Sequence, residues 1–71
     1  MAKAEKELES ARAALAEKEF DYDRQRELFP EGLASEKELQ IATRDRDQAS
    51  AKVGSAQADV DKAIADVEVA D

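Results

Sequence analysis

The chain lacks cysteine, histidine and tryptophan, and its 71 residues include one proline and two glycines. Without cysteine there can be no disulfide bonds, thiol catalysis or cysteine-ligated metal sites. Without histidine or cysteine the usual nucleophile–base pair cannot be assembled, and Ser50 and Ser55 have no base to activate them. The sequence therefore predicts no enzyme activity, no metal site and no cofactor.

Aromatic residues are also scarce, at 4% of the chain, and no apolar run reaches the length of a membrane span or a signal-peptide core. Charged residues make up 41%, with a net charge of −7. An acidic surface repels phosphate backbones, which argues against nucleic acid as a partner. The dominance of alanine and charged residues is typical of long helices or a coiled coil, with a disordered acidic segment as the alternative.

The apolar periodicity of the first half of the chain favours a helix over a disordered segment. Larger side chains recur every seven residues, and smaller or polar ones fill the intervening positions, which places one stripe on one helix face. The large positions are Leu8, Leu15, Tyr22 and Phe29, and the intervening ones are Ala4, Ala11, Lys18 and Gln25. Pro30 cannot donate a backbone N–H. The pattern therefore predicts a helix from about residue 3 to 29.

The second half is more regular, because one of its two seven-residue series consists entirely of alanine. That series is Ala42, Ala49, Ala56, Ala63 and Ala70, and the other is Leu39, Arg46, Val53, Val60 and Val67. A small residue in every heptad allows two helix backbones to approach closely. Ser35 followed by Glu38 is a capping box, so a second helix is predicted over about 36–70.

The predicted turn at 30–34 is so short that the two helices it connects must lie side by side and run antiparallel. We therefore expect an all-α, antiparallel two-helix coiled-coil hairpin, in which Leu15 lies near Val53 and Leu8 near Val60. Gly32 is expected to take a positive φ, and Ser35 to cap the second helix. A hairpin with so few large apolar side chains is marginal alone. The fragment is therefore expected to self-associate.

The bend also resembles a known family. Tyr22, Asp23 and Arg24, then Leu28, then the run 32–35 and finally Glu38 and Leu39 are similar to the hairpin tip of periplasmic adaptor proteins. These are the HlyD-like membrane fusion proteins of tripartite efflux pumps and type I secretion systems of Gram-negative bacteria. Their tip carries an arginine, a leucine four residues later and a serine seven beyond that, as do Arg24, Leu28 and Ser35.

The resemblance implies a role in bridging and docking. It implies that Arg24, Leu28 and Ser35 contact a TolC-like outer membrane channel, supported by Gly32 and Leu33. It also implies neighbouring hairpins side by side, typically six to a ring, and an inner-membrane transporter reached through lipoyl and β-barrel domains outside residues 1–71. The location implied is the periplasm, with the parent protein anchored at the inner membrane.

Two other interpretations stay open on the sequence. One is a generic structural hairpin for dimerisation or spacing, whose turn has no partner. The other is a helical insertion from a larger enzyme. Arg46 lies at a seam position and is expected to extend past Tyr22 to solvent rather than to act as a ligand.

Overall fold

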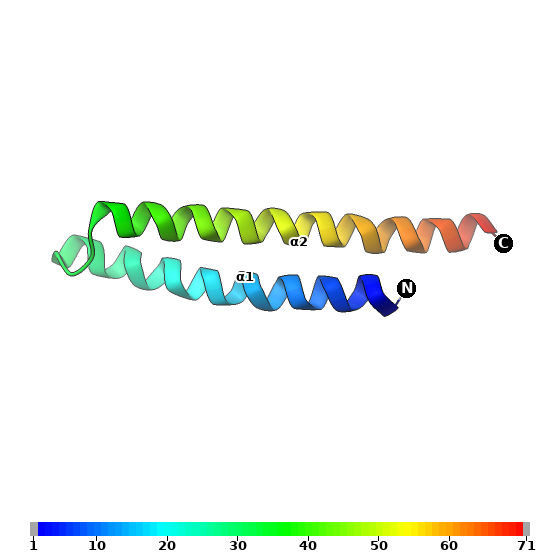
Figure 1. Cartoon of the computed structure of the whole chain (residues 1–71), viewed down its shortest axis with the longest axis horizontal. Coiled ribbons are helices and arrows are strands. Elements are labelled where there is room, and N and C mark those ends of the chain that lie inside the picture. Colours follow the sequence, from blue (N-terminus) through cyan, green and yellow to red (C-terminus); the bar gives the residue numbers. More distant parts are fainter. Residues whose placement is uncertain (1, 71) are drawn as a thin grey trace.

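The computed structural model describes the backbone of residues 2–70 and the side chains of residues 3–65. It contains helix α1 (Ala2–Leu28), a single 3-10 turn η1 (Phe29–Glu31) and helix α2 (Glu36–Ala70). The helices run side by side in opposite directions, with the bend at one end and both termini towards the other (Figure 1). The predicted all-α hairpin is confirmed, and both helices have the expected bounds to within one residue.

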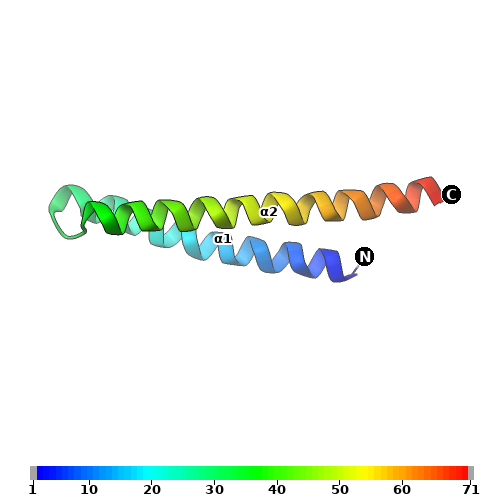
Figure 2. The ribbon, with the colours of Figure 1, turned by 45° about the horizontal axis from the view of Figure 1, so that its top comes forward.

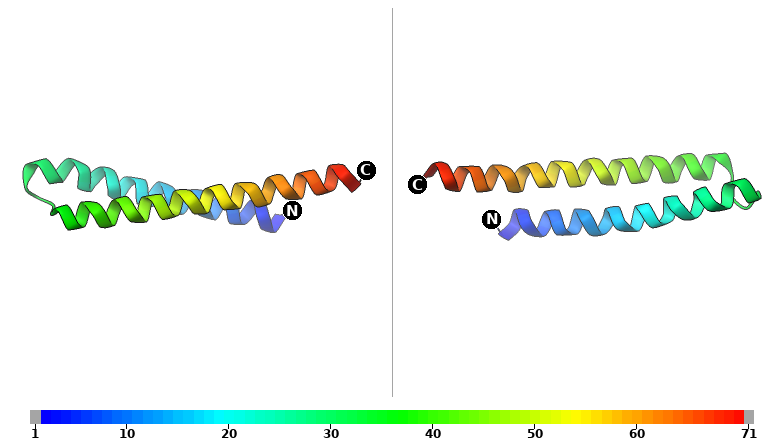
Figure 3. Two further views of the ribbon diagram at one scale, coloured as in Figure 1. Left: turned by 90° about the horizontal axis from the view of Figure 1, so that it is seen from above. Right: turned by 180° about the vertical axis from the view of Figure 1, so that it is seen from behind.

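The hairpin is a thin rod of 59 × 14 × 12 Å. Its two helices wrap around each other, since α1 passes behind α2 as the molecule is turned (Figure 2). Seen from above, α1 changes from one side of α2 to the other along its length (Figure 3, left). A strict seven-residue apolar repeat requires this wrapping, because a straight helix of 3.6 residues per turn drifts away from such a repeat.

The seam between the helices follows the heptad pattern. Its most buried side chains are Leu8 and Val60, at 7% and 9% exposure, and Ala42 at 8%. The half-buried positions on α1 are Ala4, Ala11, Leu15, Lys18, Tyr22, Gln25 and Leu28. Those at the expected seam positions of α2 are Leu39, Arg46, Ala49, Val53, Ala56 and Ala63. Each helix thus buries a single stripe and leaves the rest of its surface in water.

Two contacts between the helices fix their relative register. The Arg46 guanidinium lies 4.1 Å from the centre of the Tyr22 ring. About 15 Å further from the bend, at ~1.5 Å per residue, Arg12 donates a hydrogen bond of 2.9 Å to Gln57. In both pairs the residue numbers add to 68 or 69, and the same sum relates Leu15 to Val53 and Leu8 to Val60. The expected register therefore agrees with both contacts.

The structure corrects one seam position. Phe29 was expected to close the stripe, but it is 41% exposed and Leu28 is half-buried instead. The reason is the change from α-helix to 3-10 helix at Phe29. A 3-10 helix turns by about 120° per residue instead of about 100°, so a periodicity extrapolated from α1 places the last side chain on the wrong face.

Helix α2 is the longer arm, with 35 residues against 27 in α1. At about 1.5 Å per residue this difference corresponds to roughly 12 Å, and α2 visibly extends past the start of α1 (Figure 1). Ile64, near this overhang, is 47% exposed. The side chain of the seam residue Val67 lies outside the described residues.

Candidate docking site at the hairpin tip

The bend is built by a helix-ending motif that needs glycine. Gly32 has φ 76° and ψ 10°, in the left-handed region. Its N–H donates to the Phe29 carbonyl at 3.1 Å, and the N–H of Leu33 donates to the Leu28 carbonyl at 3.0 Å. These two bonds form a Schellman motif, which satisfies carbonyl groups that the end of a helix would otherwise leave unpaired. A side chain at position 32 would strain this backbone, so Gly32 determines where the chain reverses.

Ser35 begins the returning helix as its N-cap. The Ser35 Oγ accepts a 3.0 Å hydrogen bond from the Glu38 N–H and lies 3.2 Å from the Glu38 carboxylate, to which it donates. The Ser35 carbonyl accepts the first helical bond, from the Leu39 N–H at 3.1 Å. One hydroxyl therefore connects the bend to the first turn of α2, and it does so while remaining exposed to solvent.

Replacing this cap gives a first testable prediction. Ser35→Ala should lower the free energy of unfolding by about 1 kcal/mol, because the Glu38 N–H loses its partner. The measurement is urea unfolding followed by circular dichroism. Ser35→Asn should retain most of the stability, since asparagine caps equally well. Ser50→Ala, at an exposed site within α2, is the matched control and should not destabilise the chain. Equal losses at positions 35 and 50 would contradict the role of the cap.

The tip presents apolar side chains to solvent. Leu33 is 68% exposed and Phe29 is 41% exposed, on either side of Gly32. Leu28, which the resemblance makes a tip contact, is half-buried, and Ala34 is buried at 9%. The apolar surface available at the tip thus comes from Leu33 and Phe29 more than from Leu28. Sequence reasoning did not give Phe29 this position, since only the 3-10 turn turns it outward.

Arg24 lies on the exposed surface of α1, one helical turn before Leu28. Among the described residues, no hydrogen bond or ion pair engages its guanidinium. Arg24 precedes Gly32 by eight residues, which places it about 12 Å along the hairpin from the bend. Arg24 is therefore set back from Leu28 and Ser35, which flank the bend, so the three residues do not form one compact cluster.

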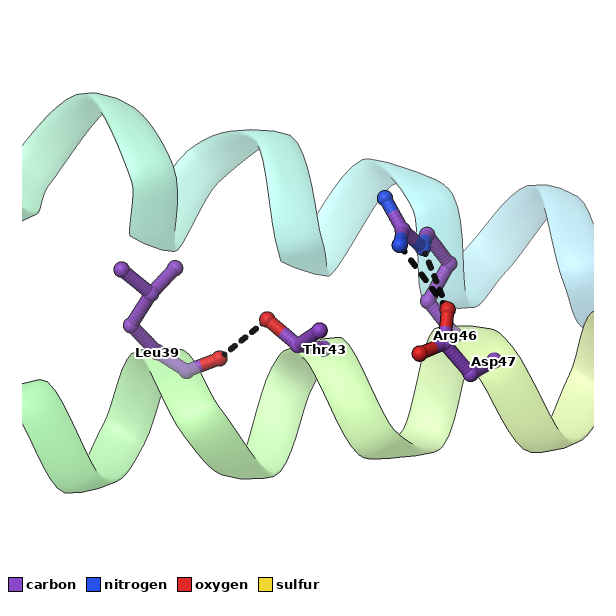
Figure 4. Close-up of polar contacts among 4 residues, drawn as sticks. All are labelled: Leu39, Thr43, Arg46 and Asp47. Atoms are coloured by element: carbon purple, nitrogen blue, oxygen red, sulfur yellow. Dashed lines mark hydrogen bonds and ion pairs between the residues drawn. The ribbon is translucent and has the colours of Figure 1, made fainter.

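Behind the tip the seam is polar. Arg46 stacks on the Tyr22 ring. It also donates to the Asp47 carboxylate at 2.8 Å and 3.2 Å, and Thr43 donates to the Leu39 carbonyl at 2.8 Å (Figure 4). The hydrogen bond with Asp47 raises the pKa of Arg46, whose guanidinium is charged at ordinary pH even without this contact. The Arg46 side chain thus lies along the Tyr22 ring and stays partly exposed to solvent. Its guanidinium is engaged by Tyr22 and Asp47 of the same hairpin.

The described residues contain no group of three or more histidine, cysteine, aspartate or glutamate side chains placed to hold a metal ion. Neither helix, over the described residues, combines the length with the hydropathy that a membrane-spanning segment requires. What this end of the molecule offers is a set of exposed side chains of mixed chemistry on a rigid bend. Such an arrangement can bind a surface, and its chemistry comes from Arg24, Leu33, Phe29 and the Ser35 hydroxyl.

Comparison with protein families bears directly on this hairpin. The family model for the α-helical hairpin domain of RND membrane fusion proteins (RND MFP) matches residues 1–71. The chain belongs to this family. No curated protein and no solved structure matched it. The membrane fusion protein hairpin is an adaptor domain rather than a catalytic one, and the match agrees with the resemblance found at the tip residues.

Proposed function

We propose that this membrane fusion protein hairpin is the docking arm of a periplasmic adaptor. The adaptor bridges an inner-membrane transporter and a TolC-like outer membrane channel, and the hairpin meets the channel with its tip. The observation that carries the proposal is the composition of that tip. Leu33 and Phe29 are exposed on a fixed bend, and Arg24 has no partner among the described residues.

Each tip residue type suits contact with the helical end of another protein. Arg24 offers a planar fork of donors, which matches carboxylates or the free carbonyls at the end of a helix. Leu33 supplies an apolar contact that is costly to leave in water, and Phe29 adds an aromatic surface of the kind enriched at interfaces. Ser35 keeps its cap and still presents an accessible hydroxyl. The Leu28 carbonyl accepts a hydrogen bond from the Leu33 N–H, and the left-handed conformation of Gly32 sets the backbone between them.

The remaining parts of the proposal follow from the family. The inner-membrane partner is an RND transporter, since the matching model is that of the RND membrane fusion proteins. The parent protein carries lipoyl and β-barrel domains, is anchored at the inner membrane of a Gram-negative bacterium and places this hairpin in the periplasm. Neighbouring hairpins stand side by side in a ring of six. Export is the activity of the whole assembly, and the hairpin contributes binding and no catalysis.

A photocrosslinking experiment tests the docking step. A benzophenone amino acid at position 33 of the intact adaptor should crosslink to the outer membrane channel in cells. The matched control is position 20, because Phe20 is 69% exposed, almost the same as Leu33 at 68%, but lies far from the bend. Crosslinks to the channel from position 33 and none from position 20 support docking by the tip. Channel crosslinks from both positions or from neither would refute it.

The same experiment separates the alternative function, that of a structural hairpin used for dimerisation or spacing. Such a hairpin would give crosslinks only to copies of itself from both positions. The exposure of Leu33 favours docking over spacing, because a spacer gains nothing from an apolar side chain at its outermost point. Isolated exposed leucines are common on protein surfaces. The two functions are therefore distinguished by which protein is crosslinked, the channel or another copy of the hairpin.

A further inference from the structure

The bend carries one charged side chain. Of residues 29–34, which connect the two helices at the end of the rod (Figure 1), only Glu31 is charged. It is the last residue of η1 and lies between Pro30, whose ring restricts φ, and the left-handed Gly32. The 3.1 Å bond from the Gly32 N–H to the Phe29 carbonyl closes this turn. Glu31 is exposed, so its carboxylate is presented to solvent from a backbone that is held on both sides.

No group of the hairpin binds this carboxylate. Two other carboxylates near the bend have partners, since Glu38 accepts a hydrogen bond from Ser35 and Glu36 accepts one of 3.4 Å from Gln40. Within the part of the chain that the structure describes, the Glu31 carboxylate makes neither a hydrogen bond nor an ion pair. Its charge is therefore available to another molecule.

The position of Glu31 is also electrostatically unfavourable within the chain. Glu36 and Glu38 lie in the first turn of α2, at the helix end where a negative charge is stabilising. Glu31 lies at the opposite kind of end, because η1 continues α1 to its C-terminus. Glu27, four residues earlier, is acidic as well and does not compensate the charge. Folding of the hairpin thus does not explain an acidic residue at position 31.

We propose that Glu31 pairs with a lysine or arginine of the outer membrane channel, and that Phe29 and Leu33 contact apolar surface beside that basic residue. This inference rests on the proposed function, and it goes further by stating what the channel surface offers. Phe29 and Leu33, at 41% and 68% exposure, lie two residues before and two residues after Glu31. Apolar contacts on both sides exclude water from an ion pair and so strengthen it.

Charge also distinguishes the channel from a second copy of this chain as the partner of the tip. Two copies meeting tip to tip would bring two Glu31 carboxylates together, and residues 29–34 contain no basic side chain to offset them. Like charges facing each other across an interface disfavour binding. Arg24 lies about 12 Å back from the bend, too far to neutralise Glu31 at the contact. The tip therefore fits a partner whose outermost charge is positive.

Binding of the intact adaptor to its purified outer membrane channel tests this pairing. Glu31→Gln keeps the shape of the side chain and removes its charge, and it should weaken the affinity about fivefold. Glu31→Lys reverses the charge and should weaken it about tenfold or more. Glu17→Lys is the matched control, because Glu17 is exposed on α1 and lies about 20 Å further from the bend. It makes the same change in net charge and should bind as the wild type does.

Two further measurements separate a binding role from a structural one. The Glu31 variants should melt no lower than the wild type, because they remove a negative charge from the C-terminal end of a helix. Raising the salt concentration from about 50 to about 300 mM should weaken binding of the wild type more than that of Glu31→Gln, since salt screens the ion pair. A change in folding alone would produce neither pattern.

Other outcomes overturn the inference. If Glu31→Lys binds as tightly as the wild type, or more tightly, no basic residue of the channel faces position 31. An equal loss in Glu17→Lys would mean that net charge, and not this position, governs binding. In each of these cases channel crosslinks from position 33 would still support docking by the tip. If the wild-type adaptor does not bind the channel and position 33 gives no channel crosslinks, the proposed function and this inference both fail.

Discussion

Arg24→Asp is expected to abolish assembly of the adaptor with the outer membrane channel and, with it, drug resistance in cells that depend on the pump. The substitution reverses a charge that the hairpin itself leaves unpaired among the described residues. Loss of a charged contact at an interface costs about 2–5 kcal/mol, so the affinity should fall about thirtyfold or more. Co-purification of channel with adaptor and drug susceptibility are the two measurements.

The control for this variant is Arg26→Asp. Arg26 is also exposed and lies in the last turn of α1, two residues further on and therefore on a different face. Both substitutions place an acidic side chain near the end of the same helix, with the same unfavourable effect on the helix dipole. Circular dichroism should give equal helix content for the two. If Arg24→Asp leaves assembly intact, or Arg26→Asp disrupts it as strongly, Arg24 is not the contact.

Leu8→Ala should have the largest effect on stability. Leu8 is 7% exposed, the most buried large side chain among those described, and it packs at the height of Val60 in the seam. Truncating a buried leucine to alanine costs about 2–5 kcal/mol. A two-helix hairpin has a small reserve of stability, so the variant should be largely unfolded near room temperature. Urea and thermal unfolding at 222 nm would measure the change.

Ile64→Ala is the matched control, because it removes the same number of carbon atoms from a side chain that is 47% exposed. It should cost a fraction of what Leu8→Ala costs, since less apolar surface is returned to water. Comparable losses at the two positions would mean that the seam does not hold the hairpin. They would also point to packing of the overhanging end of α2 against another copy.

Much of this fold could be predicted because strong local signals agree with the heptad pattern. Ser35 with Glu38 fixed the start of α2 by an N-cap whose hydrogen bonds the structure contains. Pro30 placed the end of α1 within one residue. The shortness of the turn specified the antiparallel direction and the height at which Leu8 lies opposite Val60, and the alternation of alanine with larger residues agreed with that register.

The details at the bend could not be predicted by extending the same periodicity. The 3-10 turn rotates Phe29 outward and leaves Leu28 in the seam, and no feature of the sequence marks that change of helix type. The bond between Arg12 and Gln57 was also missed. It had a signal, because both residues follow a seam alanine by one position and such flanking positions face each other across an antiparallel pair.

The candidate site was predictable in a different sense. Physical reasoning placed Gly32 and Ser35 in the bend, and the resemblance to adaptor tips assigned a role to Arg24. No property of Arg24 within this chain distinguishes it from other exposed charged residues, because the contact that we propose for it is made with another molecule. Only contacts within the hairpin contribute to its folding free energy. A residue that contacts only another molecule is therefore not marked by burial or by the heptad pattern.

The uneven composition of the seam has a mechanical consequence. In one stretch behind the bend the two arms meet through Lys18, Tyr22, Gln25 and Arg46, and the Gln25 Oε1 is buried without a hydrogen-bond partner. On both sides of this stretch the seam positions are mainly leucine, valine and alanine, and at the bend the two helices are also joined covalently. Separating the helices within the polar stretch therefore returns less apolar surface to water, and costs less free energy, than separating them on either side of it. The hairpin is held most weakly between two apolar regions, so local opening of the seam is expected there while the bend keeps its shape.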